Sequence, residues 1–400
     1  FFDIFAKDTV KTHRLLQQGA DPSARADMFL VFGAWTHGGI GETVQGEVSF
    51  PADAPYTALV ADLAAFFGWC LKDGPRPDLP PVRYYRMRLG DDGRTANGEW
   101  LTAQAWPPPS TATTLYLHDD GSLSERAPVA SETAAVLSSN PAQPIPSRGG
   151  GNLSTPAGPF DQGELDSRAD VLTATTLPAD QDVTLDGDVV ARIHAASSTT
   201  DADVIVRLSQ VTPSGRAMLL ADGIRRGRFL GGSDAIRPLT PGTPALFEVE
   251  VGPVAFVLPR GHALRLSVQP SSSPRYEPNP GVAAALATNP GPQVHEVTLF
   301  RDPAMPSSVI LPITTGSFPS PTGLDADAGS SSPDAAHAPD VSGEDAGADS
   351  VDVGTAMADA GGQPAPAANS GCGCAATTTA LSTVPVLGLL ASLRGRRRRL

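Results

Sequence analysis

The sequence has very little cysteine, and a long part of it lacks basic residues. Three cysteines among 400 residues are too few for a disulfide framework. No lysine or arginine lies between Arg301 and Arg394, although aspartates recur in that stretch. The net charge of −14 argues against nucleic acid as a partner, because a surface that binds nucleic acid has to be basic.

The start of the chain also lacks two features. It reads FFDIF, with neither a methionine nor the pattern of a secretory signal peptide. We therefore expect Phe1 to be an internal position of a longer protein.

Helix and strand patterns alternate in residues 1–79. Apolar residues recur at helical spacing over residues 4–20, and the short apolar run at residues 28–34 is typical of a fully covered strand. A second helix begins near Asp53 and ends at Gly74, with Cys70 expected as a small core residue on its apolar side. Two helices and one strand cannot cover a parallel sheet. The sequence therefore predicts a fragment of an α/β domain, and we expect the missing strands of its sheet upstream of Phe1.

The rest of the chain divides into three segments. In residues 80–302, short β-rich runs such as ADVIVRLSQV alternate with glycine turns, which predicts an all-β jelly-roll domain. Residues 303–370 are rich in Ala, Asp, Ser and Pro, and we predict a disordered acidic linker because so few apolar residues cannot offset the entropy of ordering. Residues 371–400 combine a Gly-Cys pair, a short hydrophobic stretch and an arginine cluster, which predicts a sorting or anchoring tag.

His37 follows the predicted strand in the segment LVFGAWTHGG. Catalytic groups gather at the carboxyl ends of strands in open α/β sheets. Histidine is the usual general base for a serine, and it needs a carboxylate to fix its tautomer. Asp3 is the natural candidate for that carboxylate. On spacing alone a structural role is favoured for both residues, since an aspartate at a helix start is commonly an N-cap and a histidine on a turn is more often structural or solvated.

A nucleophilic serine is not found in the chain. No G-x-S-x-G motif occurs, and GGSDA around Ser233 lacks the second glycine. In α/β-hydrolases the serine precedes the acid and the histidine, so we expect it upstream of Phe1.

Residues 1–300, roughly, contain a series of distinctive segments in a fixed order. They are FFDIF, LVFGAWTHGG, FFGWCLKDG, PPVRYYRMR, GEWLTAQAWPPPSTATTLYLHDDGSLS, PSRGGGNL, GPFDQGELDSRADVL and FVLPRGHALRLSVQPSSSPRYEPNP. In this combination they resemble the second half of the cocaine-esterase/X-prolyl dipeptidyl-peptidase hydrolases, a group that includes α-amino-acid ester hydrolases and glutaryl-cephalosporin acylases.

The resemblance implies an α/β-hydrolase domain with a helical cap, followed by a jelly-roll domain packed against it. Asp3 matches the family's catalytic aspartate, and His37 matches its catalytic histidine in a G-x-W-x-H-G motif. Ala34 stands where the family usually has proline. The serine, the cap and the tyrosine of the oxyanion hole would lie upstream. The resemblance thus shifts the interpretation of Asp3 and His37 toward catalysis.

Two groups in the β region are open to structural interpretations. His262 matches a family position but opens a predicted strand, which favours a structural role. Arg225, Arg226 and Arg228 either pair with carboxylates across the domain interface or form a solvated basic face.

The tail carries Cys372 and Cys374 before an apolar segment that Pro385 interrupts. Two thiols are too few for a closed zinc site. With the terminal arginines, the arrangement resembles myxobacterial-type C-terminal sorting tags, which a dedicated membrane protease processes. The cysteine would then be the site of cleavage and anchoring, and a plain membrane anchor is the alternative. We expect an exported protein held at the cell surface or outer membrane, with the acidic linker as a spacer.

These features predict a serine hydrolase that cleaves an ester or amide bond, of the acyl or X-Pro dipeptidyl type, in a small-molecule or peptide substrate. His37 would accept and return the proton of the serine, and Asp3 would orient His37. We expect no cofactor and no metal site, and no activity from residues 1–400 by themselves. The alternatives are a surface-anchored β-sandwich adhesion or carbohydrate-binding protein with a vestigial hydrolase part, and a purely structural surface protein.

Overall fold

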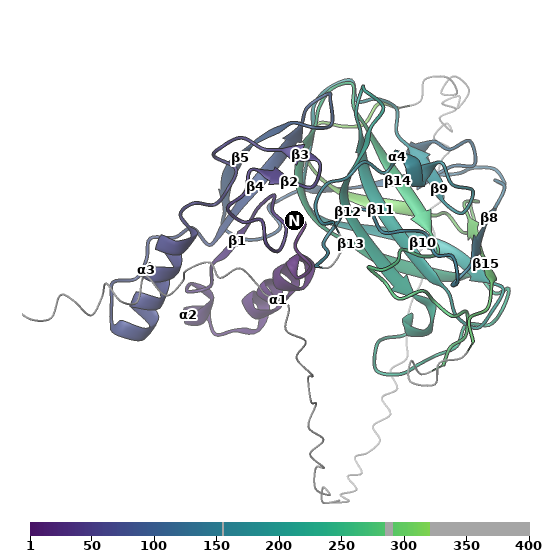
Figure 1. Ribbon diagram of the computed structural model, residues 1–400, viewed down its shortest axis with the longest axis horizontal. Helices are drawn as coiled ribbons and strands as arrows, with labels where there is room; N and C mark the ends of the chain where they lie inside the picture. The colour runs from purple at the N-terminus through teal and green to yellow at the C-terminus, as the bar shows by residue number, and fades with distance from the viewer. Residues whose placement is uncertain (154–155, 285–290, 321–400) are drawn as a thin grey trace, which may run out of the picture. The chain divides into compact units, whose positions relative to one another are not determined.

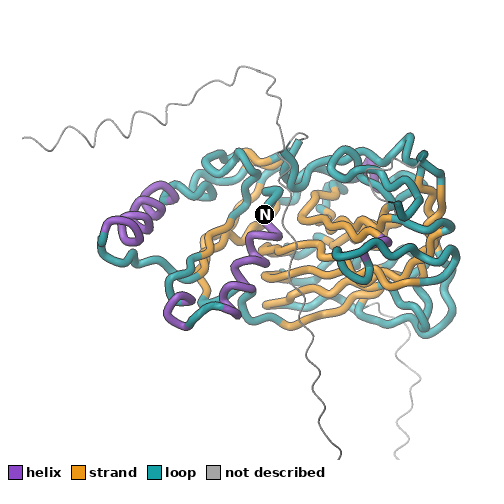
Figure 2. Tube along the Cα trace, turned by 90° about the horizontal axis from the view of Figure 1, so that it is seen from below, coloured by secondary structure: helices purple, strands orange, loops and turns teal. Residues whose placement is uncertain are grey.

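β-Strands make up most of the regular secondary structure (Figure 1, Figure 2). The computed structural model describes residues 1–153, 156–284 and 291–320. Its helices are α1 (Ala6–Gly19), α2 (Pro22–Arg25), α3 (Leu59–Lys72) and α4 (Gly163–Asp166), with a 3-10 turn η1 (Gly227–Phe229). Its strands are β1 (Leu30–Phe32), β2 (Val44–Gln45), β3 (Val48–Ser49), β4 (Val82–Leu89), β5 (Ala96–Ala103), β6 (Thr111–Leu117), β7 (Leu123–Ser124), β8 (Ala135–Ser139), β9 (Leu172–Thr175), β10 (Val183–Ser197), β11 (Asp203–Val211), β12 (Ala217–Arg226), β13 (Ala245–Leu258), β14 (Ala263–Gln269), β15 (His295–Phe300) and β16 (Ser308–Thr315).

Two sheets form a sandwich around a shared core. The larger sheet has ten strands, with the central order β1-β4-β13-β10-β16-β6-β7, and the smaller sheet has the order β12-β11-β14-β9. The chain crosses repeatedly between the sheets, since β10 and β13 belong to the larger sheet and the strands that follow them, β11 and β14, belong to the smaller one. Such crossovers are typical of double-sheet jelly rolls. The prediction that the region after residue 80 is mostly β is confirmed.

Strand β11 shows how the sequence pattern is used. Its alternating residues Val204, Val206 and Leu208 face the main core, as the period of two predicts. The residues between them are buried as well, because the segment that contains α4 covers the outer face of the strand. There Arg207 Nη2 lies 2.8 Å from Asp166 Oδ1, so the buried guanidinium has a carboxylate partner.

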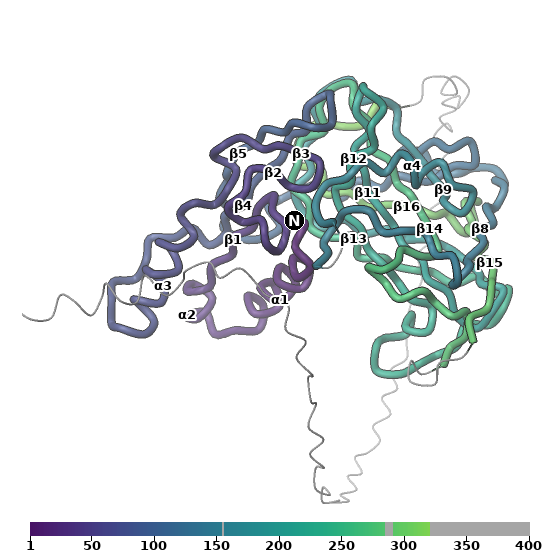
Figure 3. Tube along the Cα trace, viewed as in Figure 1, coloured from purple at the N-terminus to yellow at the C-terminus, as the bar shows by residue number. Residues whose placement is uncertain are grey.

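The N-terminal segment is joined to the sandwich by strand β4. Its first residues pair in parallel with β1, through Leu30 and Val82, and its later residues pair with β13, through Met87 and Phe256. Helix α1 lies beside β13 (Figure 3), where Lys11 Nζ donates to Glu250 Oε1 at 2.8 Å. One sheet therefore runs from the predicted hydrolase part into the β region.

Helix α3 differs from its prediction in two respects. It begins at Leu59 rather than near Asp53, and it ends at Lys72, where the C-cap Asp73 takes the left-handed conformation one residue before Gly74. None of its residues is buried, and Cys70 is exposed, so the prediction of Cys70 as a core residue is wrong. The physical reason is that the described residues cover this helix only in part. Phe66 contacts Phe29, whereas Phe67 and Leu71 are exposed.

The β region extends beyond its predicted end at residue 302. Strand β16 pairs with β10 and β6 in the middle of the larger sheet, and its residues Val309 and Leu311 are fully buried. Residues 303–320 were wrongly placed in the linker, because their proline content hid a strand. The remaining linker residues and the tag of residues 371–400 lie outside the described residues. No helix in the described ranges is long and apolar enough to cross a membrane.

The arginines near η1 pair within the β region rather than across a domain interface. Arg228 Nε donates to Asp201 Oδ2 at 2.6 Å, and Arg226 Nε donates to Asp203 Oδ1 at 2.8 Å. The Asn279 amide donates to both carboxylates and joins the two pairs. Burial raises the pKa of Asp203, while its guanidinium and amide donors oppose that shift. For Arg226 and Arg228, both predicted alternatives, a solvated basic face and ion pairs across the domain interface, are therefore wrong.

Candidate active site

Asp3 and His37 lie together where β1 ends and α1 begins. Phe2 forms a parallel β-bridge with Thr36. Asp3 and His37, the next residue on each segment, therefore lie side by side. Asp3 Oδ2 lies 3.0 Å from His37 Nδ1, and Asp3 Oδ1 accepts the backbone N–H of Phe5 at 2.7 Å. The N-cap of α1 is Phe5, so the predicted alternative of Asp3 as an N-cap is wrong. Asp3 lies two residues earlier, where its carboxylate binds both the Phe5 N–H and the imidazole.

The hydrogen bond defines the tautomer of His37. A carboxylate only accepts, so Nδ1 carries the proton, and Nε2 of the neutral ring is left as an acceptor. The His37 side chain is 48% exposed, which leaves its ring open to a substrate or a nucleophile. The Phe5 ring stands edge-on to the imidazole, with the ring centroids 5.4 Å apart. This arrangement is the histidine–carboxylate half of a serine-hydrolase triad.

A loop of the β region contacts the same site. A Cβ atom on Gly151 would lie 2.8 Å from the backbone oxygen of Asp3, which is too close for any side chain. The glycine-rich segment PSRGGGNL, noted only as a family motif, therefore lies directly against the carboxylate's backbone. Sequence spacing gave no sign of this contact, because 148 positions separate the two residues.

Sequence analysis also missed Gln45. Its side chain is buried, and its amide binds Thr36 and Gly39 on either side of His37. No motif marks this glutamine, and the only available signal was a polar residue in the short run TVQGEV between two turns.

A serine–histidine–carboxylate cluster also lies in the β region. His118 Nδ1 lies 2.7 Å from Glu132 Oε1, and its Nε2 lies 3.2 Å from Ser124 Oγ. The same Nε2 lies 3.0 Å from the backbone oxygen of Arg126, so the serine shares this nitrogen with a second group. Because His118 and Ser124 are also buried, the cluster fits a structural role in this turn.

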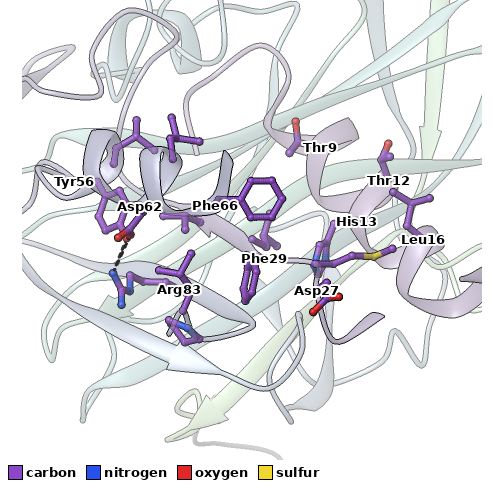
Figure 4. Close-up of a pocket in the computed structure, with 17 residues that line it drawn as sticks. Thr9, Thr12, His13, Leu16, Asp27, Phe29, Tyr56, Asp62, Phe66 and Arg83 are labelled. Carbon is purple, nitrogen blue, oxygen red and sulfur yellow. Dashed lines mark hydrogen bonds and ion pairs between the residues drawn. The ribbon is translucent and has the colours of Figure 1, made fainter. Parts of the chain in front are cut away.

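A pocket of about 500 Å³ lies between α1, β1 and α3 (Figure 4). Most of its lining is apolar, including Phe29 and Phe66, and the polar group Tyr56, Asp62 and Arg83 stands at one side. Burial lowers the pKa of His13, which also lines the pocket. Neither Asp3 nor His37 contributes to it. The pocket thus leaves apolar side chains of α1, β1 and α3 accessible, and it is distinct from the candidate active site.

The remaining predicted site residues are placed as follows. His262 is fully buried, with Nδ1 2.7 Å from Gln210 Nε2 and Nε2 2.8 Å from Asp91 Oδ1, which fits the predicted structural role. Cys372 and Cys374 lie outside the described residues. Within the described ranges, no group of three or more His, Cys, Asp or Glu side chains is placed to hold a metal ion. The catalytic roles of Asp3 and His37 stay predictions.

Comparison with known proteins finds one matching family model and several similar hydrolases. Residues 77–310 match the family model described as the X-Pro dipeptidyl-peptidase C-terminal non-catalytic domain. The chain is similar to cocaine esterase from Rhodococcus sp. (strain MB1 Bresler), with 29% identity over 334 residues that cover 78% of this chain and 55% of the relative.

Two solved structures are also similar. One is an aminopeptidase from the marine sediment archaeon Thaumarchaeota archaeon, with a TM-score of 0.65 and 25% identity, and the other is an α-amino acid ester hydrolase, with a TM-score of 0.62 and 26% identity. Each alignment covers 76% of this chain and 52% of the other. The chain thus spans about half the length of the relatives it matches. Because the family model matches more than half of the chain, the resemblance found in the sequence is confirmed, and the chain belongs to the cocaine-esterase/X-Pro dipeptidyl-peptidase family.

Proposed function

We propose that the chain is the C-terminal part of a serine hydrolase that cleaves an ester or amide bond, with Asp3 and His37 as two members of its triad. The single observation that carries the proposal is the 3.0 Å contact between Asp3 Oδ2 and His37 Nδ1. The hydrolytic names of the similar proteins support the same chemistry.

In the proposed reaction, a serine from the polypeptide before Phe1 attacks the acyl carbon. His37 Nε2 accepts the proton of the serine hydroxyl, and the acyl carbon–leaving group bond breaks as His37 returns that proton to the leaving alcohol or amine. Water then attacks the acyl-enzyme through the same histidine and releases the acid. Asp3 keeps the Nδ1 proton in place and stabilises the imidazolium that forms in both steps.

The exposed apolar side chains of α3 and the free edge of β1 support the proposal that preceding polypeptide packs against residues 1–79. Val60, Phe67 and Leu71 on α3 are 68%, 52% and 75% exposed, and β1 is an edge strand that pairs only with β4 among the described strands. Soluble proteins rarely expose a continuous apolar face with a pocket of this size. We propose that preceding residues add parallel strands at β1 and cover α3, which would complete an α/β-hydrolase domain.

The substrate class follows from the proposed chemistry. An acyl-enzyme mechanism suits an acyl ester, an α-amino ester, an amide or an X-Pro peptide, and the similar proteins are named for an ester, an amino acid ester and a peptide N-terminus. Phe5 beside the imidazole would present an apolar edge to the acyl group.

We further propose that the protein is exported and held at the cell surface by its tail. The support is the sequence alone, in which an acidic linker is followed by Cys372, Cys374, an apolar segment and arginines. Mass spectrometry of the C-terminal peptide from native protein tests this. A peptide ending at the cysteine pair would support a processed tag, and an intact peptide ending in the arginines would refute processing.

Fluorophosphonate labelling of the intact native protein tests the hydrolase proposal. We expect one labelled serine, and we expect labelling to be lost in His37→Ala but kept in the control His194→Ala, whose ring lies in strand β10. Residues 1–400 by themselves should not be labelled. Labelling that survives in His37→Ala would refute the role of His37, and a folded protein without any labelling would favour a binding role for the β sandwich.

A further inference from the structure

Gln45 is bound through its whole amide group to the turn that carries His37. Its Oε1 accepts from Thr36 N at 2.9 Å and from Thr36 Oγ1 at 3.1 Å. Its Nε2 donates to the backbone oxygens of Gly39 at 2.6 Å and of Glu42 at 2.9 Å. A glutamine amide has two acceptor positions and two donors, so all four are used. The side chain is 2% exposed, and these bonds are therefore hardly weakened by competition with water.

We propose that Gln45 is a positioning residue for His37, and that it links the location of the imidazole to the β region. The proposal rests on the proposed function, since a fixed imidazole matters for chemistry only if His37 is the general base.

The exposed imidazole needs support from its backbone. The described contacts of the ring are its hydrogen bond to Asp3 and its edge contact with Phe5, and half of the side chain faces solvent. The turn has its own bond from Gly39 N to Thr36 O at 3.0 Å, which closes the loop but does not fix it relative to the rest of the protein. Gln45 supplies that attachment, because its amide forms hydrogen bonds to Thr36, just before His37, and to Gly39, two residues after it.

The residues next to Gln45 are tied to the β region. Glu47 N donates to the backbone oxygen of Pro159 at 3.0 Å, and its carboxylate pairs with Arg148 at 3.2 Å and with Arg216. Gly46 has a φ of 56°, and a Cβ atom there would lie 2.6 Å from the Pro159 oxygen. The hairpin of β2 and β3 is therefore seated on the β region. A displacement of that region would reach His37 through Gln45.

The ring signals of His37 in the chain labelled with ¹⁵N-histidine test this inference without requiring turnover. His37→Asn identifies the His37 signals among those of the seven histidines. In the wild type we expect a hydrogen-bonded Nδ1–H signal that Asp3→Ala abolishes, because alanine has no acceptor for this proton. Gln45→Leu, which has a similar size but no polar atoms, should shift or abolish the same signal and should make the Thr36 amide exchange about tenfold faster.

Gln269→Leu is the matched control. Gln269 is also buried, at 1% exposure, and its Nε2 binds a backbone oxygen, that of Ser271, far from His37 in the sequence. It removes a buried glutamine amide at another place in the fold, and it should leave the His37 signals unchanged. Gln45→Glu keeps the acceptors for Thr36 but loses both donors, so it should disturb the Gly39 side of the turn and should alter the His37 signals even if Gln45→Leu does not fold.

The outcomes separate the two proposals. A wild-type His37 spectrum in folded Gln45→Leu or Gln45→Glu would overturn the positioning role and leave the proposed function standing. A wild-type spectrum in Asp3→Ala would mean that the Asp3–His37 bond is absent in solution, and it would remove the basis of both proposals. Equal disturbance of His37 by Gln269→Leu would also overturn the inference, because the effect would then be a general one.

Discussion

The buried pair of Arg228 and Asp201 gives a sharp prediction for stability. The two side chains are 1% and 0% exposed, and Asp201 also accepts from the backbone N–H of Arg228 and from the Asn279 amide. Asp201→Ala leaves a buried guanidinium and two further donors without this acceptor. Breaking a buried pair from one side costs about 3–5 kcal/mol, because the remaining charge stays desolvated. A loss of this size should lower the melting temperature by roughly 5–10 °C.

Urea denaturation of the folded chain, followed by circular dichroism, measures this loss. Asp234→Ala is the control, because Asp234 and Arg237 form a pair with side chains 72% and 50% exposed. Exposed pairs contribute about 0.2–1 kcal/mol or less, so the control should be nearly as stable as the wild type. The double variant Asp201→Leu/Arg228→Met should recover much of the loss, since no charge stays buried. Equal effects of Asp201→Ala and Asp234→Ala would refute the reasoning.

Three other perturbations test separate parts of the structure. Asp3→Asn in the intact protein should slow fluorophosphonate labelling by roughly 10²–10⁴-fold, because His37 loses the carboxylate that orients it, and an unchanged rate would contradict that role. Gly46→Ala should lower the free energy of unfolding by about 1–3 kcal/mol, as its positive φ and its approach to Pro159 leave no room for a side chain, and wild-type thermal stability would exclude this. Burial lowers the pKa of His13, so the unfolded chain takes up this proton at a higher pH than the folded protein does. The part of the free energy of unfolding that depends on His13 is therefore complete above about pH 6.5, and it is lost as the pH falls through the lower pKa of the folded state. His13→Leu should therefore flatten the decrease of stability on acidification, and an unaltered pH profile would show that His13 does not contribute.

Local patterns in the sequence predicted much of the secondary structure and the two main candidates for the site. The period of two in Val204, Val206 and Leu208 predicted a strand with one face toward the core, and helical spacing predicted α1. Asp3 and His37 were found because each stands at the boundary of an element inside a family motif. These signals survive without tertiary information, since they depend only on neighbouring residues.

Long-range packing decided the rest. The strand β16 was overlooked because its pairing partners β10 and β6 lie more than one hundred residues earlier in the sequence, and nothing near Pro312 indicates them. Cys70 was misplaced because an apolar helix face is buried only where another segment covers it. Gln45 was missed because an amide can bind any backbone group that folding brings near it. The sequence by itself therefore determined most of the elements and the two candidate residues of the site. Only the tertiary structure decided which edges pair, which faces are covered and which side chains bind the turn around His37, because those contacts join residues whose separation along the chain leaves no local pattern.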